Sequence, residues 1–227
     1  MKRRKRSRIL WLLAALLLFA GAGGLTARNL AQEKNAAAQS QQAMEVLAEQ
    51  LAELPAVTVR TLDEQRLHGP AQDDGEEDLQ PSAVQQPSAD SDEAPQQKAP
   101  EPVERTYIGV LSVPSLHLQL PVQESWSYAD LKATPCRLQG SPQQQDLVIL
   151  AHNYKSHFGR LKELVQGDEV SFTSMDGVTY VYYVDCLETV EPQQVAKVTG
   201  GDWPLTLFTC TPGGLTRLVV YCTMQAQ

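Results

Sequence analysis

Two residues near the carboxyl end of the chain have types and spacing that suit acyl-transfer chemistry. The run LTLFTC has the pattern of a strand that delivers Cys210 to a turn, and the next strand-like run begins at Arg217. Direct pairing across a closed hairpin sets the two Cβ atoms about 5 Å apart. A thiolate is a nucleophile that a nearby cation favours. A guanidinium stays protonated, so Arg217 is suited to bind a carbonyl or stabilise an oxyanion.

A third group must move the proton, and histidine is the preferred residue. His152 ends the apolar run LVILAH, where a rigid strand end presents a side chain. From spacing alone, two buried structural residues are favoured over a Cys210–His152 nucleophile pair. The other three histidines are interpreted as a linker residue, a strand residue and a polar-turn residue: His68, His117 and His157.

Short apolar and β-branched runs predict the elements that position these residues. Two strands are predicted within 106–123, one on each side of Pro114. Others are predicted in DLVILAHN, DEVSFTS, VTYVYYVDCLE, PLTLFTC and TRLVVYC, and FGRLKELV has the pattern of one short helix. Many short strands with few helices predict an all-β fold, a closed or nearly closed barrel.

The amino-terminal segment predicts a membrane anchor. The basic residues 1–8 precede an apolar run within 9–26, which is near the short end of what spans a bilayer. The positive-inside rule keeps residues 1–8 cytoplasmic and exports the rest, so the protein is expected at the cell membrane as a single-pass protein with an extracytoplasmic domain. Because of the length of the apolar run, a retained anchor is favoured over a signal peptide cleaved near Ala20-Gly21-Ala22.

Composition divides the remaining chain into three segments. Residues 27–62 are predicted as a helical spacer, because the Ala-, Gln-, Glu- and Leu-rich run within them has apolar residues three and four apart and ends at Pro55. A spacer is favoured over a dimerising coiled coil, since the apolar stripe is short. Residues 63–104 are rich in Pro, Gln and acids and predict a disordered linker. One folded domain is expected at 105–227.

Several other functions and sites are disfavoured by composition. The net charge of −8 comes largely from acidic residues before position 105, and the one dense basic cluster adjoins the anchor, so no nucleic-acid partner is expected. The spacings of cysteine and histidine match no zinc motif, and no metal ligands are assigned. The remaining cysteines are expected to be structural and outside any disulfide framework: Cys136, Cys186 and Cys222.

The TLFTC run, an arginine on the next strand and an upstream strand ending in His-Asn together resemble the sortases, membrane-anchored cysteine transpeptidases of mainly Gram-positive bacteria. The TLxTC signature of that family is matched at Thr206, Leu207, Thr209 and Cys210. The runs IGVLSVPSLHLQLPV, LVILAHNYKSHFGRLKEL and GDEVSFTSMDGVTYVYYV are also similar to family segments, in the family's order. The resemblance covers nearly all of 106–224 and implies a closed sortase-like β-barrel of about eight strands with one or two short helices.

This resemblance implies a role for each candidate residue. Cys210 is the expected nucleophile, His152 the proton carrier and Arg217 the essential arginine, while Thr209 and Asn153 are expected in the substrate site. The implied reaction cleaves an LPxTG-like sorting signal through a thioacyl-enzyme and transfers the protein to an amine of a peptidoglycan precursor. The implied partners are surface proteins that carry the signal and that precursor, and no cofactor is needed.

Two alternative functions stay open at this point. A sortase-like barrel can serve as a noncatalytic surface-binding module, because fold does not dictate activity. A hydrolase would pass the same thioacyl group to water. The short loop between Cys210 and Arg217 also leaves the subclass and the sorting motif open, with anchoring of single proteins favoured over pilus assembly.

Overall fold

The computed structural model describes residues 2–60, 105–200 and 203–224, with side chains from residue 18 onward except those of residues 20, 195 and 197. The helices are α1 (Lys2–Ala52) and α3 (Val195–Thr199), and short 3-10 helices lie at Pro114–Leu116, Asp130–Lys132, Leu161–Glu163 and Pro192–Gln194. The strands are β1 (Val57–Val59), β2 (Tyr107–Val113), β3 (Leu118–Gln123), β4 (Cys136–Gln139), β5 (Leu147–Ala151), β6 (Glu169–Ser174), β7 (Val178–Val190), β8 (Leu205–Cys210) and β9 (Arg217–Thr223).

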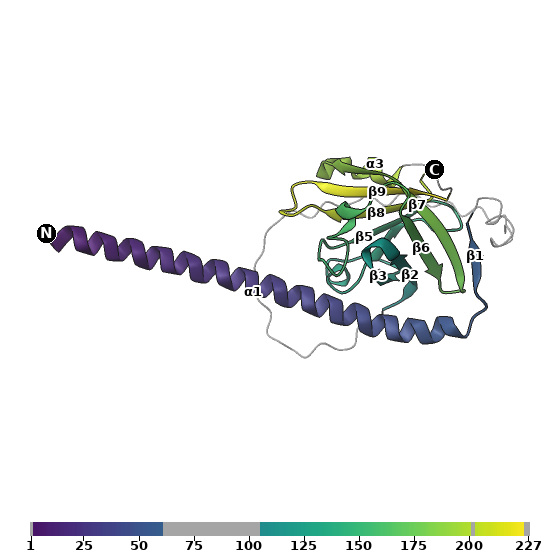
Figure 1. Cartoon of the computed structure of the whole chain (residues 1–227), viewed down its shortest axis with the longest axis horizontal. Helices are drawn as coiled ribbons and strands as arrows, with labels where there is room; N and C mark the ends of the chain where they lie inside the picture. Colours follow the sequence, from purple (N-terminus) through teal and green to yellow (C-terminus); the bar gives the residue numbers. More distant parts are fainter. Residues whose placement is uncertain (1, 61–104, 201–202, 225–227) are drawn as a thin grey trace.

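The strands of the described residues form one sheet that closes on itself. Their order is β1-β7-β6-β2-β3-β4-β5-β8-β9, and β9 also pairs with β7. Eight strands therefore make a closed barrel (Figure 1). The long strand β7 pairs with β1 near its start and with β9 along its second half, so β1 extends the edge of β7 where β9 is absent.

Strands β5 and β8 are buried on both faces, because two hydrophobic cores lie on opposite sides of this part of the sheet. Leu147, Ile149 and Leu207 point into the barrel. The alternate residues, such as Leu150 and Phe208, lie in a second core on the outer face. Parallel strands buried on both faces are expected to be continuous apolar runs, as β5 is, whereas β8 also contains the buried Thr206 and Thr209.

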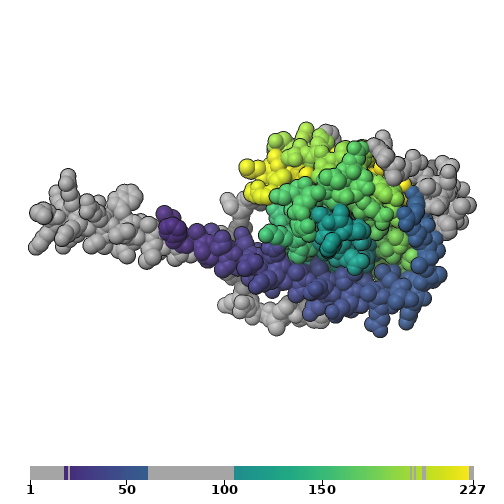
Figure 2. All heavy atoms as spheres, viewed as in Figure 1, coloured from purple at the N-terminus to yellow at the C-terminus, as the bar shows by residue number. Residues whose placement is uncertain are grey.

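The carboxyl-terminal part of α1 lies along the barrel, while its amino-terminal part extends away from it (Figure 1). Figure 2 shows the carboxyl-terminal part of the helix directly against the barrel surface. Ala36, Ser40 and Leu47, which share one helix face, are all at most 4% exposed. Residues predicted as a spacer are thus packed on the barrel, and the chain then adds β1 to the sheet.

Most predicted strands are confirmed, and the all-β barrel with about eight strands is confirmed with them. The exceptions have local causes. The predicted helix FGRLKELV forms only the 3-10 helix Leu161–Glu163, because a run this short gains little from helix propagation. His117 is not a strand residue; it caps the preceding 3-10 helix with a left-handed φ of 52°.

The membrane anchor at 9–26 stays a prediction. Among the residues whose side chains are described, no helix has an 18-residue stretch that is apolar enough to cross a membrane. The side chains of 9–17 and 20 lie outside the described residues. The predicted linker at 63–104 also lies outside the described residues. The boundaries of the five predicted segments (1–8, 9–26, 27–62, 63–104 and 105–227) remain predictions.

Leu47→Ala should lower the free energy of unfolding by about 2–5 kcal/mol, because it leaves a cavity between α1 and the barrel. Leu47 is 2% exposed, whereas the neighbouring Val46 is 57% exposed. Val46→Ala is therefore the matched control and should change stability by less than about 0.5 kcal/mol. Urea unfolding of the full-length chain in detergent, followed by tryptophan fluorescence, measures both. Equal effects of the two substitutions would contradict docking of the helix.

Candidate active site

The parallel pairing of β5 with β8 positions the candidate histidine and cysteine. The register ends at Ala151↔Thr209, so His152 follows β5 at the level of Cys210, the last residue of β8. Both residues continue the outer face of the sheet, which carries Leu150 on β5 and Phe208 on β8 in the second core. The structure therefore brings the predicted pair together at the edge where that core ends.

The predicted arginine pairs with the cysteine across the hairpin. Cys210 and Arg217 are register partners in β8 and β9. The guanidinium, however, turns toward the hairpin loop: Nη1 donates to the carbonyl oxygens of Gly214 at 2.8 Å and Thr216 at 3.1 Å. Within the described residues, Nε and Nη2 of Arg217 make no hydrogen bond. These donors are free to bind a carbonyl or an oxyanion next to the thiol.

The hairpin loop between the two residues is held by paired threonines. The Thr211 amide donates to the Thr216 carbonyl at 3.0 Å, and the two hydroxyls lie 2.8 Å apart. Gly213 and Gly214 have φ values of 85° and 71°, a conformation in which a side chain is strained. The Thr211–Thr216 bonds therefore close the loop, the two glycines permit its backbone, and the carbonyls that Arg217 binds lie within it.

The imidazole of His152 is partly buried in a setting that favours its neutral form. Its Nε2 atom is buried and has no hydrogen-bond partner among the described residues. Burial lowers the pKa of His152 below its ordinary value, and the charge of Lys132 lowers it further, so the neutral ring is favoured. The ring of Tyr154 packs at a tilt against it, with centroids 4.9 Å apart. A neutral imidazole beside a thiol can serve as a general base.

The two predicted substrate-site residues are in different environments. Thr209 is 3% exposed, and its hydroxyl donates to the carbonyl of Ala151 at 2.8 Å. This bond joins β8 to β5 immediately before the Cys210–His152 level, so Thr209 supports the alignment of the pair. Asn153 is half-buried in the loop that follows His152. Substrate roles for both residues stay predictions.

The loop after His152 is tightly wound, and Gly159 permits this. The Phe158 amide donates to the His152 carbonyl at 3.1 Å, and the Gly159 amide donates to the Tyr154 carbonyl at 2.8 Å. A Cβ at Gly159 would overlap the carbonyl oxygens of Asn153 and Tyr154. These backbone hydrogen bonds therefore hold the loop that follows His152 in a tight turn.

His157 was expected in a polar turn but is completely buried at 0% exposure. Its Nε2 atom lies 3.2 Å from Ser40 Oγ of α1, and its ring lies 5.6 Å from that of Tyr154. Burial lowers the pKa of His157 to about 4, with a smaller effect from His152. Sequence analysis missed this residue because its partner lies on a helix 117 positions earlier.

The other cysteines occupy different environments, and the structure describes all four as free thiols. Cys136 and Cys222 are buried, as expected, and burial raises the pKa of Cys136 to about 12. Cys186 is exposed, so its assignment as a structural residue is wrong. The register shift between Val184 and Cys186 in β7 explains this, since a bulge breaks the alternation of faces.

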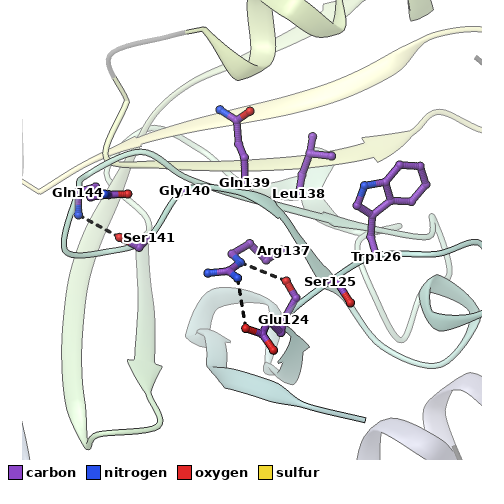
Figure 3. Close-up of a pocket in the computed structure, with 9 residues that line it drawn as sticks. All are labelled: Glu124, Ser125, Trp126, Arg137, Leu138, Gln139, Gly140, Ser141 and Gln144. Atoms are coloured by element: carbon purple, nitrogen blue, oxygen red, sulfur yellow. Dashed lines mark hydrogen bonds and ion pairs between the residues drawn. The ribbon is translucent and has the colours of Figure 1, made fainter. Parts of the chain in front are cut away.

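A separate polar pocket lies beside β4, where Arg137 points toward Glu124 (Figure 3). Arg137 Nε donates to the Glu124 carbonyl at 3.1 Å, and the two side chains form an ion pair at 3.7 Å. Neither Cys210 nor His152 lines this pocket. Among the residues described, no group of three or more His, Cys, Asp or Glu side chains is arranged to hold a metal ion.

The chain is similar to known proteins. Residues 111–225 match the family model "Sortase domain". Sortase A from Corynebacterium diphtheriae is similar in structure at 27% identity and a TM-score of 0.49, with 54% of this chain and 62% of that chain covered. Sortase C from Streptococcus pneumoniae is similar at 29% identity and a TM-score of 0.46, with 51% and 65% covered. No curated protein matches the chain. This chain thus spans less than two thirds of both solved relatives.

Protonation of His157 should make stability depend on pH. Its pKa is lowered to about 4 from an ordinary 6.5, so between these values the unfolded chain binds more protons than the folded one. Stability is therefore lost as the pH falls through this window, by about 3 kcal/mol in total. His157→Gln should reduce the slope, and His117→Gln, at an exposed histidine, should not. Urea unfolding between pH 4 and 7 measures both; an unchanged slope in His157→Gln would refute the assignment.

Thr209→Val should lower the free energy of unfolding by about 1–3 kcal/mol, because it leaves the buried carbonyl of Ala151 without its donor. Thr209→Ser keeps a hydroxyl and should lose less. The bond to Ala151 is 2.8 Å long in the native chain. Thermal unfolding of both variants tests this expectation, and a valine variant as stable as the serine variant would show that the bond contributes nothing.

Proposed function

This chain belongs to the sortase family, and we propose that it is an extracytoplasmic cysteine transpeptidase that joins exported proteins to a cell-wall amine. The observation that carries the proposal is the edge shared by β5 and β8, where His152 adjoins Cys210. Arg217, in register with Cys210, adds a cation with unused donors. Nucleophile, base and oxyanion-binding group are the three parts that acyl transfer needs.

The first half of the proposed reaction cleaves a peptide bond. The neutral imidazole of His152 takes the proton from the Cys210 thiol, and the thiolate attacks the threonine carbonyl of an LPxTG-like sorting signal. The free donors of Arg217 bind the oxygen as its negative charge develops. His152 then gives its proton to the leaving amine, the C–N bond breaks, and the acyl group remains on sulfur as a thioester.

The second half of the proposed reaction forms a new amide. An amine of a peptidoglycan precursor attacks the thioester and gives up a proton to His152, which returns it to the leaving thiolate of Cys210. One peptide bond is exchanged for another, so no oxidant or nucleotide is consumed. The half-buried position of Cys210 suits this reaction, because the residue stays partly accessible to peptide and amine.

The remaining parts of the proposal concern location and partners. The apolar run within 9–26, with basic residues before it, supports a single membrane anchor with an extracytoplasmic catalytic domain. The partners are surface proteins that carry the sorting signal and the peptidoglycan precursor that supplies the amine. Residues 27–104 contain no Phe, Trp or Tyr and so no aromatic lid motif of the kind associated with pilin-polymerising relatives, which supports anchoring of single proteins over pilus assembly.

Full-length chain in detergent should form an acyl adduct on Cys210 when it is mixed with a library of LPxTG-like peptides. Intact mass spectrometry detects the adduct, and its loss on treatment with hydroxylamine identifies a thioester. Cys210→Ala should lower adduct formation by at least about a thousandfold, because the nucleophile is gone. Cys186→Ala, at an exposed thiol, is the matched control and should react normally.

The same experiment separates the alternative functions. A product that contains an added amine supports transpeptidation, whereas the hydrolysed acid alone, with amine in excess, would indicate a hydrolase. No adduct with any peptide, in a folded sample whose Cys210 still reacts with a thiol reagent, would favour a noncatalytic binding module. Full adduct formation by Cys210→Ala would refute the mechanism.

A further inference from the structure

A short stretch of α1, residues 33–40, is hydrogen-bonded to the loop that follows the candidate base His152. Glu33 Oε1 accepts a hydrogen bond from the backbone amide of Lys155 at 3.0 Å, three residues after His152. Ser40, two helical turns further along, contacts His157 in the same loop. Residues four and seven apart share a helix face, so one face of α1 meets the loop at two separated points.

Ser40 also ties this loop to a second segment next to the site. Its hydroxyl donates to the carbonyl of Ala133 at 2.9 Å and lies 3.2 Å from Nε2 of His157. Because the hydroxyl proton is used at Ala133, Ser40 Oγ must accept from Nε2–H of a neutral His157. Ser40 is 4% exposed, so water does not compete for these bonds. The neighbouring Lys132 is the residue whose charge acts on His152.

A row of aromatic rings continues from this contact to the candidate base. The ring of His157 packs against Tyr154 with centroids 5.6 Å apart, and Tyr154 packs against His152 at 4.9 Å. His157 is fully buried, so it has no room to shift independently of its neighbours. A displacement of Ser40 would therefore move the ring of His157, then the ring of Tyr154, and through them the imidazole of His152.

We propose that residues 33–40 of α1 form a positioning element for His152, in which Ser40 fixes His157 and Glu33 fixes the backbone at Lys155. This rests on the proposed function, because it assigns His152 as the general base. The helix that carries the predicted anchor would thereby set the orientation of the base toward Cys210. Ser40, Glu33 and His157 are positioning residues; none of them touches the reacting thiol.

Single-residue variants of the full-length chain in detergent test the proposal with the peptide that labels Cys210. Ser40→Ala should lower kcat about tenfold while KM changes less than about twofold, since misorientation of the base affects the transition state and not peptide binding. Glu33→Ala should lower kcat in the same way. Glu33→Gln keeps an oxygen that accepts from the Lys155 amide, so it should restore most of the rate.

Matched controls lie on exposed positions. Glu49→Ala removes another carboxylate of α1, and Ser115→Ala removes an exposed hydroxyl. Both should leave kcat and KM unchanged. A loss of kcat in Glu33→Gln equal to that in Glu33→Ala, or an unchanged kcat in Ser40→Ala, would overturn the proposal. Should Ser40→Ala fail to fold, the two Glu33 variants decide the question.

An activity-independent readout keeps this inference separate from the proposed function. The ring protons of His152 experience the ring current of Tyr154, so their NMR chemical shifts report the orientation of the two rings. These shifts should change in Ser40→Ala and stay unchanged in Ser115→Ala. If the wild-type chain forms no acyl adduct, the proposed function fails and the NMR shifts alone decide: unchanged shifts in Ser40→Ala overturn the positioning element.

Discussion

The parallel pairing of β5 with β8 is the constraint on which the rest of the structure depends. A parallel pair needs a crossover connection, and here residues 152–204 between the two strands contain β6, β7 and α3. Closure of that long loop costs chain entropy, which the buried apolar faces of both strands must offset. The register is therefore decisive: a slip of one residue in β8 would turn Cys210 to the opposite face of the sheet from His152. The bond from Thr209 to Ala151 lies one residue before this level and opposes such a slip.

Two-sided burial explains why the site can be both rigid and reachable. The inner core fills the barrel, and the outer core covers the opposite face of β4, β5, β8 and β9, up to the strand ends. Phe208 is 8% exposed, while Cys210, two residues further on the same face, is only half-buried. The thiol thus sits where the outer core stops, on a backbone that is packed from both sides. Arg217 reaches this edge from β9, and its bonds to the hairpin carbonyls hold the guanidinium close to it.

What the sequence predicted correctly follows from local patterns. Alternation and apolar runs predicted most strands, and the outer core confirms that Val148 and Leu150 share one face of β5 and that Phe208 lies in the same core. What it missed depends on distant partners. The burial of His157 requires α1 above it, and a polar sequence around a histidine carries no sign of that cover. Strand β4 contains Arg and Gln at alternate positions, a composition that does not indicate a strand. The direction of the Arg217 guanidinium depends on the exact loop geometry.

The docking of α1 has an electrostatic consequence for the candidate base. With the helix in place, His157 is buried and its pKa is about 4, so it stays neutral beside Tyr154 and His152 at physiological pH. Without the helix, the ring would meet water and its pKa would return toward 6.5, so that near neutral pH a minority of molecules would carry a positive charge on His157, close to His152. A like charge there disfavours the imidazolium that forms in the proposed reaction when His152 accepts the thiol proton. The helix therefore acts on His152 in two ways, by fixing the orientation of the loop and by keeping a nearby titratable ring uncharged, and both effects arise from contacts of one helix face.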